Sequence, residues 1–226
     1  MYNGNENLIN DGEYLQYTML DFWKWAYSNL SHNMLRGKFA EFIVKSALDK
    51  SGYALNPEVI MGIEPFDLNG PRLPFGNRNA RLEVKSAAYL QSWDIRHPEK
   101  GLGAINPTFS IAPSKLPDKD GDFNKDAPRQ RNNDVYIFSL YTAKSRKCNI
   151  LDLSWWEFYI IPTFILDENP ELTARKTISL KKIKQLNIHP TAFKDLCEEI
   201  VTACNSIPEK HCSKPLIFIP PPQKNR

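Results

Sequence analysis

Long hydrophobic runs are missing from the sequence, and none approaches the roughly 20 residues that an α-helix needs to cross a bilayer. The first eleven residues also lack the basic segment followed by an apolar segment that marks a secretory signal. Both absences favour a cytoplasmic protein that acts outside the membrane, and we expect this location for the chain.

Cysteine is scarce as well: the 226 residues contain four, and no two of them form a CxxC pair. A chain of this length can bury a core large enough to fold without disulfides, so we expect reduced thiols. The one alternative that the spacing allows is a zinc site at Cys204, His211 and Cys212.

Motifs of several enzyme classes are absent, namely GxSxG, GxxxxGK[ST] and HExxH, which argues against serine hydrolases, P-loop NTPases and zinc metalloproteases. An excess of charge of one sign is missing too, because the net charge is only +3. This weak basicity permits a polyanionic partner without requiring one. With 24% charged and 42% hydrophobic residues, the composition is that of a globular domain, and we predict a single domain over residues 1–226.

Apolar residues at helical spacing predict two helices near the start of the chain, over residues 11–30 and 33–50. Aromatic residues surround the apolar stripe of the first helix. We expect that helix to pack in the core or in a dimer contact, with base stacking as the third option. Gly52 stands where a left-handed cap would end the second helix.

The rest of the chain is dominated by short β-type runs. We predict strands over residues 58–62, 65–69, 81–88, 108–112, 134–142 and 156–162, and a helix over 191–204. The last two strands are apolar almost throughout, as expected of central strands covered on both faces. A long polar insertion occupies about residues 95–133, and a Pro-rich tail occupies about 208–226. This order predicts a mixed α/β domain.

The triplet Glu83-Val84-Lys85 is the only Asp/Glu-x-Lys sequence in the chain. On a strand, residues two apart project from the same face, roughly 6 to 7 Å from each other. Glu83 can therefore ligate a metal while Lys85 addresses a water molecule, and Asp67, one hairpin upstream, can supply a second carboxylate. Phosphodiester hydrolysis with Mg²⁺ needs this combination of hard oxygen ligands and a nearby cation. The alternative is a solvated face of an edge strand with a cross-strand ion pair.

The stretch RGKFAEFIVKSALDKSGY, residues 36–53, resembles the opening helix of Holliday-junction-resolvase-like nucleases. In those proteins Gly-x-x-Ala-Glu begins a helix that ends near Gly-Tyr, and an Asp and then Glu-Val-Lys follow. This chain supplies the same series in the same order, as Gly37, Ala40, Glu41, Gly52, Tyr53, Asp67, Glu83, Val84 and Lys85. Over about residues 33–92 the sequence is therefore similar to the PD-(D/E)xK superfamily. The resemblance implies a restriction-endonuclease-like core, a mixed central sheet flanked by helices.

The match departs from the family pattern at the proline. Phe66 separates Pro65 from Asp67, and the only true Pro-Asp pair, at residues 117–118, follows the Glu-x-Lys triplet instead of preceding it. We retain Asp67 as the acidic residue, with Glu64 as a neighbour that could replace it.

The resemblance implies further site residues. Glu41 is expected to bind the metal directly or through water, although an exposed ion pair with Lys45 would also explain its position. Gln91 is expected near the scissile phosphate. Candidate DNA contacts are the arginines of two loop regions, Arg72, Arg78, Arg81, Arg129 and Arg131.

The sequence thus predicts hydrolysis of DNA phosphodiester bonds with Mg²⁺ held by Asp67, Glu83 and Glu41, and with Mn²⁺ as a substitute. The expected form is a restriction-type endonuclease that acts on double-stranded DNA, and a homodimer would suit an enzyme that cuts both strands. The alternative is a catalytically inactive module that keeps the nuclease fold and binds nucleic acid or a protein. DNA and RNA are not distinguished by the sequence.

Overall fold

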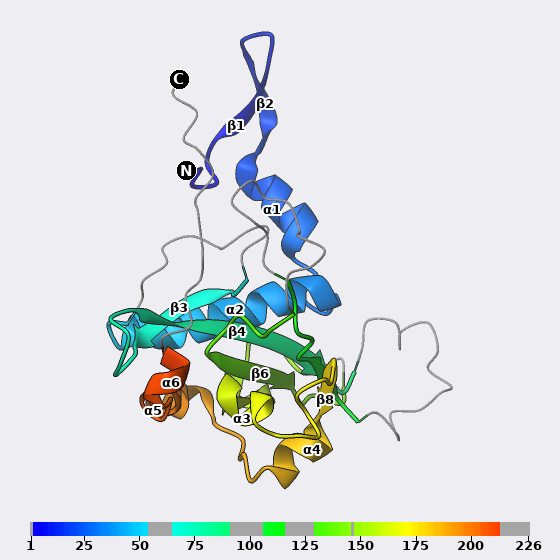
Figure 1. The fold of residues 1–226 in the computed structure, drawn as a ribbon. Coiled ribbons are helices and arrows are strands. Elements are labelled where there is room, and N and C mark those ends of the chain that lie inside the picture. Colours follow the sequence, from blue (N-terminus) through cyan, green and yellow to red (C-terminus); the bar gives the residue numbers. More distant parts are fainter. Residues whose placement is uncertain (1, 54–64, 91–105, 116–128, 146, 213–226) are drawn as a thin grey trace.

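The computed structural model describes residues 2–53, 65–90, 106–115, 129–145 and 147–212. Its centre is a four-stranded sheet with the strand order β3-β4-β6-β7 (Figure 1). The strands are β3 (Leu68–Arg72), β4 (Asn79–Ala88), β6 (Val135–Tyr141) and β7 (Trp156–Pro162). β4 and β6 run parallel, while β3–β4 and β6–β7 are antiparallel. The domain is therefore mixed α/β with a mixed central sheet.

The two apolar strands predicted late in the chain are confirmed as β6 and β7. Every residue of β6 is buried, and all of β7 is buried except Glu157. β6 is an inner strand, whereas β7 is the last strand of the described sheet. The outer edge of β7 is partly covered, because Phe158 and Thr191 exchange two backbone hydrogen bonds of 3.0 and 2.7 Å. The two faces of β7 are also buried, with Phe158 and Ile160 in one core and Tyr159 and Ile161 in the other, which explains why a terminal strand has the sequence of a central one.

One face of the sheet packs against α2 (Asn33–Lys50) and α5 (Leu196–Asn205). The bounds of α2 agree with the prediction, and Gly52 has a φ of +79°, which confirms the left-handed cap. The predicted C-terminal helix is split in two: a 3-10 turn, η4 (Phe193–Asp195), leads directly into α5. A short last helix, α6 (Glu209–Cys212), lies within the segment predicted as a tail.

The opposite face is covered by small elements around Phe109 and Phe138, whose rings lie 4.9 Å apart. They are β5 (Thr108–Ser110), α3 (Thr163–Asp167), β8 (Thr177–Ser179) and α4 (Leu180–Gln185). The predicted strand at 108–112 is confirmed in shorter form as β5, which pairs with β8. The three elements of residues 163–185 were not predicted. A 3-10 turn, η3 (Leu153–Trp155), precedes β7.

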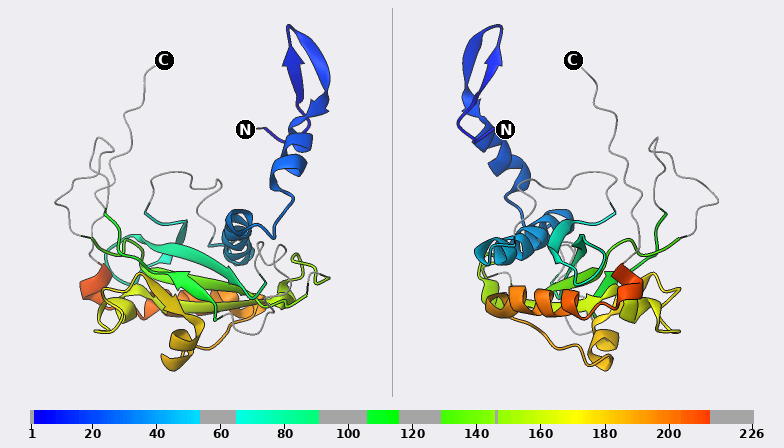
Figure 2. Two further views of the ribbon diagram at one scale, coloured as in Figure 1. Left: turned by 90° about the vertical axis from the view of Figure 1, so that its right-hand side faces the viewer. Right: turned by 60° about the vertical axis from the view of Figure 1, so that its left-hand side comes forward.

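The helix predicted over residues 11–30 is wrong in its first half. Residues 7–18 form a hairpin of β1 (Asn7–Asn10) and β2 (Glu13–Thr18), and only then does α1 (Met19–Tyr27) begin. Asp11 and Gly12 both have positive φ, the geometry of a tight hairpin turn. Thr18 and Asp21 form a capping box that fixes the start of α1. Figure 2 shows the hairpin and α1 projecting from the rest of the domain.

Several predictions lie outside the described residues: the strand at 58–62, most of the insertion at 95–133, and the tail beyond residue 212. Among the described helices, none has the length and apolar character to cross a membrane.

Candidate active site

Asp67 is held against β4 by the first rung of the β3–β4 hairpin. Its backbone N–H donates to the carbonyl of Leu82 at 2.9 Å. In return, the backbone N–H of Val84 donates to Oδ2 of Asp67 at 2.8 Å. The carboxylate of Asp67 is thereby fixed beside the backbone between Glu83 and Lys85.

Glu83 and Lys85 share one face of β4, as the alternation of the strand predicts. Leu82 and Val84, with 0% and 5% exposure, belong to the core that the sheet forms with α2 and α5. The Glu83 and Lys85 side chains keep 17% and 32% exposure, and the Lys85 ammonium donates a hydrogen bond to Oε1 of Glu83. Both groups can therefore be reached from solvent, although most of their surface is buried.

Glu41 approaches the same place from α2. Its carboxylate keeps only 14% exposure and accepts a hydrogen bond of 2.8 Å from Lys38. The carboxylate of Glu41 lies close enough to Asp67 and Lys85 for their charges to shift its pKa. The partner of Glu41 is thus Lys38, whereas Lys45 pairs with Asp49. The surface pair of Glu41 with Lys45 weighed from the sequence does not form.

Three carboxylates therefore surround one ammonium group. Burial, opposed by Lys85 and helped by the charges of Asp67 and Glu41, raises the pKa of Glu83 to about 7. Burial also raises the pKa of Glu41. Burial alone would lower the pKa of Lys85, but the surrounding carboxylates raise it above its ordinary value. Lys85 thus stays charged, and the cluster has an excess of negative charge that a bound cation would offset.

Within the described residues, no three acidic, histidine or cysteine side chains are arranged to hold a metal ion. This holds for Cys204, His211 and Cys212, where the sequence allowed a zinc site. His211 instead pairs with Glu168 at 3.0 Å, and the Cys212 thiol donates to the carbonyl of Ile207. In the acidic cluster, the ion pair of Glu83 with Lys85 holds the Glu83 carboxylate.

The five predicted DNA-contacting arginines divide into two groups. Arg72 and Arg129 are exposed. Arg78 makes two hydrogen bonds to Asp134, of 2.6 and 2.8 Å, and a third to the carbonyl of Cys212. Arg81 is buried and donates to the carbonyl of Asn132.

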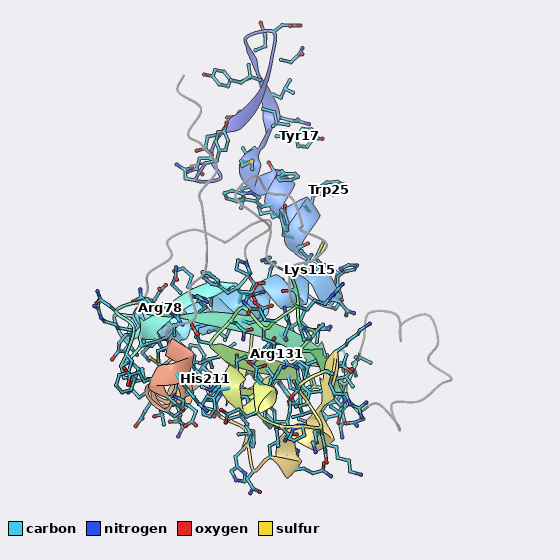
Figure 3. All side chains as sticks on the ribbon, in the orientation of Figure 1. Tyr17, Trp25, Arg78, Lys115, Arg131 and His211 are labelled. Carbon is cyan, nitrogen blue, oxygen red and sulfur yellow. The ribbon has the colours of Figure 1, made fainter. Side chains whose placement is uncertain are left out.

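Arg131 is the most deeply anchored of these arginines (Figure 3). Its guanidinium, 1% exposed, pairs with Asp167 at 2.7 Å and donates to the carbonyls of Ile111 and Leu172. These bonds join the core around Phe109 and Phe138 to the loop after α3. Arg78, Arg81 and Arg131 therefore hold the fold together, and we retain only Arg72 and Arg129 as DNA-contact candidates. Gln91 and Glu64 lie outside the described residues.

Two further residues beside the cluster were not singled out from the sequence. Arg36, buried on α2, donates from Nε to Oγ of Ser86 at 3.3 Å and from Nη1 to the carbonyl of Ser31 at 3.4 Å. Because Ser86 follows Lys85 on β4, this contact fixes the start of α2 against the strand that carries the site. Burial lowers the pKa of Arg36 to about 10. The sequence feature that could have identified Arg36 is its position directly before Gly37, in the stretch of residues 36–53 that resembles the nuclease helix.

No family model matches the chain, and comparison with curated proteins and with solved structures gives no significant match.

Proposed function

We propose that the chain is a divalent-cation-dependent deoxyribonuclease with a restriction-endonuclease-like PD-(D/E)xK core. The observation that supports this most strongly is the convergence of three carboxylates, from α2, from the start of β3 and from β4, on a single lysine. Partly buried like charges are costly unless a cation compensates them. Lys85 pairs with Glu83 and Lys38 pairs with Glu41, so the three carboxylates exceed the two ammonium groups by one.

The chemistry of these donors suits Mg²⁺, which prefers carboxylate oxygens and keeps several of its waters. Among the described residues no three such groups are arranged around an ion, and Glu83 is paired with Lys85, so binding would need these side chains to turn. Asp67 and Glu83 would hold the ion, with Glu41 as a direct or water-mediated ligand, and Mn²⁺ would substitute because it accepts the same oxygen ligands. When bound, the ion supplies charge neutralisation at the phosphate and a water of lowered pKa.

The protein groups have separate roles in this proposal. The N–H of Val84 donates to Oδ2 of Asp67 and so holds this carboxylate beside β4. Lys85 has three N–H donors and gives one to Glu83, so that the others can orient the attacking water. Arg36 would position the site without touching the substrate, because its hydrogen bond to Ser86 holds α2 against β4. Arg72 and Arg129, both exposed, would contact backbone phosphates of double-stranded DNA. A restriction-type endonuclease is the biological form that the sequence resemblance favours.

A plasmid-cleavage time course tests the proposal. Wild-type protein should cut supercoiled DNA with Mg²⁺ or Mn²⁺ and not with EDTA. Lys85→Met, which keeps the length of the side chain, should reduce the rate by about 100-fold or more. Lys50→Ala, at the exposed end of α2, is the matched control and should cut like wild type.

The inactive-module alternative makes the opposite prediction. A folded wild-type protein that binds duplex DNA in EDTA but cuts neither DNA nor RNA with either metal would refute the catalytic proposal. It would leave a binding module on the same fold.

A further inference from the structure

Residues 2–31 form an ordered element that projects from the other described parts of the chain (Figure 2); we call it the arm. The N–H of Met19 donates to the carbonyl of Glu6 at 2.8 Å, and the N–H of Leu20 donates to the carbonyl of Gly4 at 3.0 Å. A Cβ at Gly4 would lie 3.1 Å from the ring of Trp23, so that the start of the chain packs closely on α1. The arm therefore has defined internal structure.

The outer surface of the arm is nevertheless rich in large apolar side chains. No residue of α1 is buried, and Trp25 is 83% exposed. Figure 3 shows Tyr17 and Trp25 on the arm, away from the sheet. The exposed set comprises Leu8, Ile9, Tyr14, Leu15, Tyr17, Leu20, Phe22, Trp25 and Tyr27. A two-stranded hairpin is at best marginally stable by itself, so this apolar surface needs a partner.

Charge indicates which partner. The arm contains four carboxylates and one lysine, which gives it a net charge of −3. Since the whole chain carries +3, the remainder of the chain carries +6. An acidic arm repels nucleic acid and attracts a partner of opposite net charge, and the remainder of another copy of this chain has that charge.

A receiving surface of the right kind lies on α2. Met34, Lys38 and Phe42 follow one another at four-residue spacing and so form one outward stripe, which we call the α2 stripe. Met34 and Phe42 are 68% and 60% exposed, and the Lys38 side chain is 47% exposed. The stripe is thus apolar, with Lys38, the ion-pair partner of Glu41, at its centre. The chain's own arm does not cover it, because α1 leads away from the body of the domain (Figure 1).

We propose that two copies of the chain associate by exchanging arms, with the arm of each copy on the α2 stripe of the other. A two-fold arrangement of this kind uses both surfaces twice and leaves neither exposed. It pairs Trp25 and its apolar neighbours with Met34 and Phe42, and it brings the acidic arm near the Lys38 ammonium, which also pairs with Glu41 of its own chain. The proposal concerns assembly, and its test measures association instead of DNA cleavage.

Sedimentation equilibrium of the full chain tests the assembly. Wild type should be a dimer at about 10 μM, and Trp25→Ser should raise the dimer dissociation constant by at least about 10-fold, as expected for a tryptophan at the centre of an interface. Phe75→Ser removes an exposed aromatic ring at the β3–β4 turn, beside α6, and should leave the constant unchanged. Both side chains are exposed, so circular dichroism should show an unchanged fold for each variant.

Mixing two variants separates arm exchange from other dimers. The proposed dimer contains two contacts, each between the arm of one copy and the α2 stripe of the other. In a dimer of Trp25→Ser chains both contacts are damaged on the arm side, and in a dimer of Phe42→Ser chains both are damaged on the stripe side. A mixed dimer retains one intact contact, made by the arm of the Phe42→Ser chain on the stripe of the Trp25→Ser chain. The mixture should therefore dimerise more tightly than either variant alone.

A monomeric wild type at these concentrations, a dimer insensitive to Trp25→Ser, or a mixture no tighter than its components would each overturn the proposal. Binding of duplex DNA by a monomer that weakens in Trp25→Ser would also overturn it and would assign the arm to nucleic acid.

Discussion

The chain contains two antiparallel hairpins that differ in what surrounds them. The β1–β2 hairpin is exposed throughout except at Thr18, whereas β3 and β4 contribute most of their residues to the core. Their turns are alike, since each contains a glycine and a neighbouring Asp or Asn at positive φ. Turn chemistry therefore specifies a hairpin in both places, while only the packing makes one of them part of the domain. The packed hairpin carries the candidate active site, and the exposed one carries the proposed dimer contact.

The largest expected difference between the hairpins is in catalysis. Asp67→Asn should reduce DNA cleavage by about 1000-fold, because it removes a metal-binding charge while the amide can still fill the same space. Glu13→Gln makes the same chemical change on β2, where the side chain is exposed, and should cleave at the wild-type rate. Initial rates on supercoiled plasmid provide the measurement. Equal losses in both variants would contradict the assignment of the site to β3–β4.

The hairpins should also differ in their contribution to stability. Leu82 on β4 is fully buried, so Leu82→Ala should lower the free energy of unfolding by about 2 to 5 kcal/mol. Leu15 on β2 is 41% exposed, and Leu15→Ala should change the free energy of unfolding by less than about 0.5 kcal/mol. Urea denaturation below the dimer dissociation constant checks both values. A cost for Leu15→Ala close to that for Leu82→Ala would show that the arm packs within its own chain.

A glycine substitution sharpens the same contrast. A Cβ at Gly70 on β3 would lie 2.9 Å from three side-chain carbons of Leu82, so Gly70→Ala should destabilise the domain by about 1 to 3 kcal/mol. A Cβ at Gly12 would meet nothing within 4 Å, although the φ of +85° there strains alanine. Gly12→Ala should therefore loosen the β1–β2 turn without lowering the global unfolding midpoint. Thermal unfolding of the two variants side by side distinguishes these effects.

An effect of similar size is expected for the pH dependence of stability. The pKa of Glu83 is raised by burial to about 7 in the folded protein, so the folded state binds more protons than the unfolded state between about pH 4.5 and 7. Stability should fall as the pH rises through this window, by about 1 to 3 kcal/mol without divalent cations. On the arm, hydrogen bonds from Thr18 lower the pKa of Asp21. The contribution of Asp21 to stability therefore increases as the pH rises, which is opposite to that of Glu83.

Urea denaturation across that pH range measures the slope. Glu83→Gln should flatten it, and addition of Mg²⁺ should flatten it as well, because a bound cation stabilises the ionised carboxylate. A slope that persists in Glu83→Gln would assign the titration to another group.

Local patterns were sufficient to predict α2 and the strands β4, β6 and β7. The apolar spacing of α2 and the glycine at residue 52 predicted its bounds, and alternation on β4 predicted which side chains face the core. The same spacing misled at residues 11–30, where the apolar residues fit a helical face as well as an alternating strand. The Asp11-Gly12 turn decided in favour of the hairpin. α3, β8 and α4 have only three to six residues each, too few to show a period.

The candidate site was predictable to the extent that its geometry is local. Glu83 and Lys85 share a strand face, and Asp67 is their neighbour across one hairpin. The roles of the arginines depend on distant partners. Arg131 is bound by acceptors that lie 20 to 44 residues away in sequence, and Arg78 by an aspartate 56 residues away. No local pattern distinguishes such an anchoring arginine from one that awaits a phosphate.

Direct binding of Mn²⁺, followed by its effect on water-proton relaxation, tests the central claim that the three carboxylates form a cation site. Wild type should bind in the micromolar to millimolar range, and Glu41→Gln, Asp67→Asn and Glu83→Gln should each weaken binding, with Asp49→Asn on the exposed side of α2 as the unchanged control. Binding that is equally strong in wild type and in the three cluster variants would contradict the account.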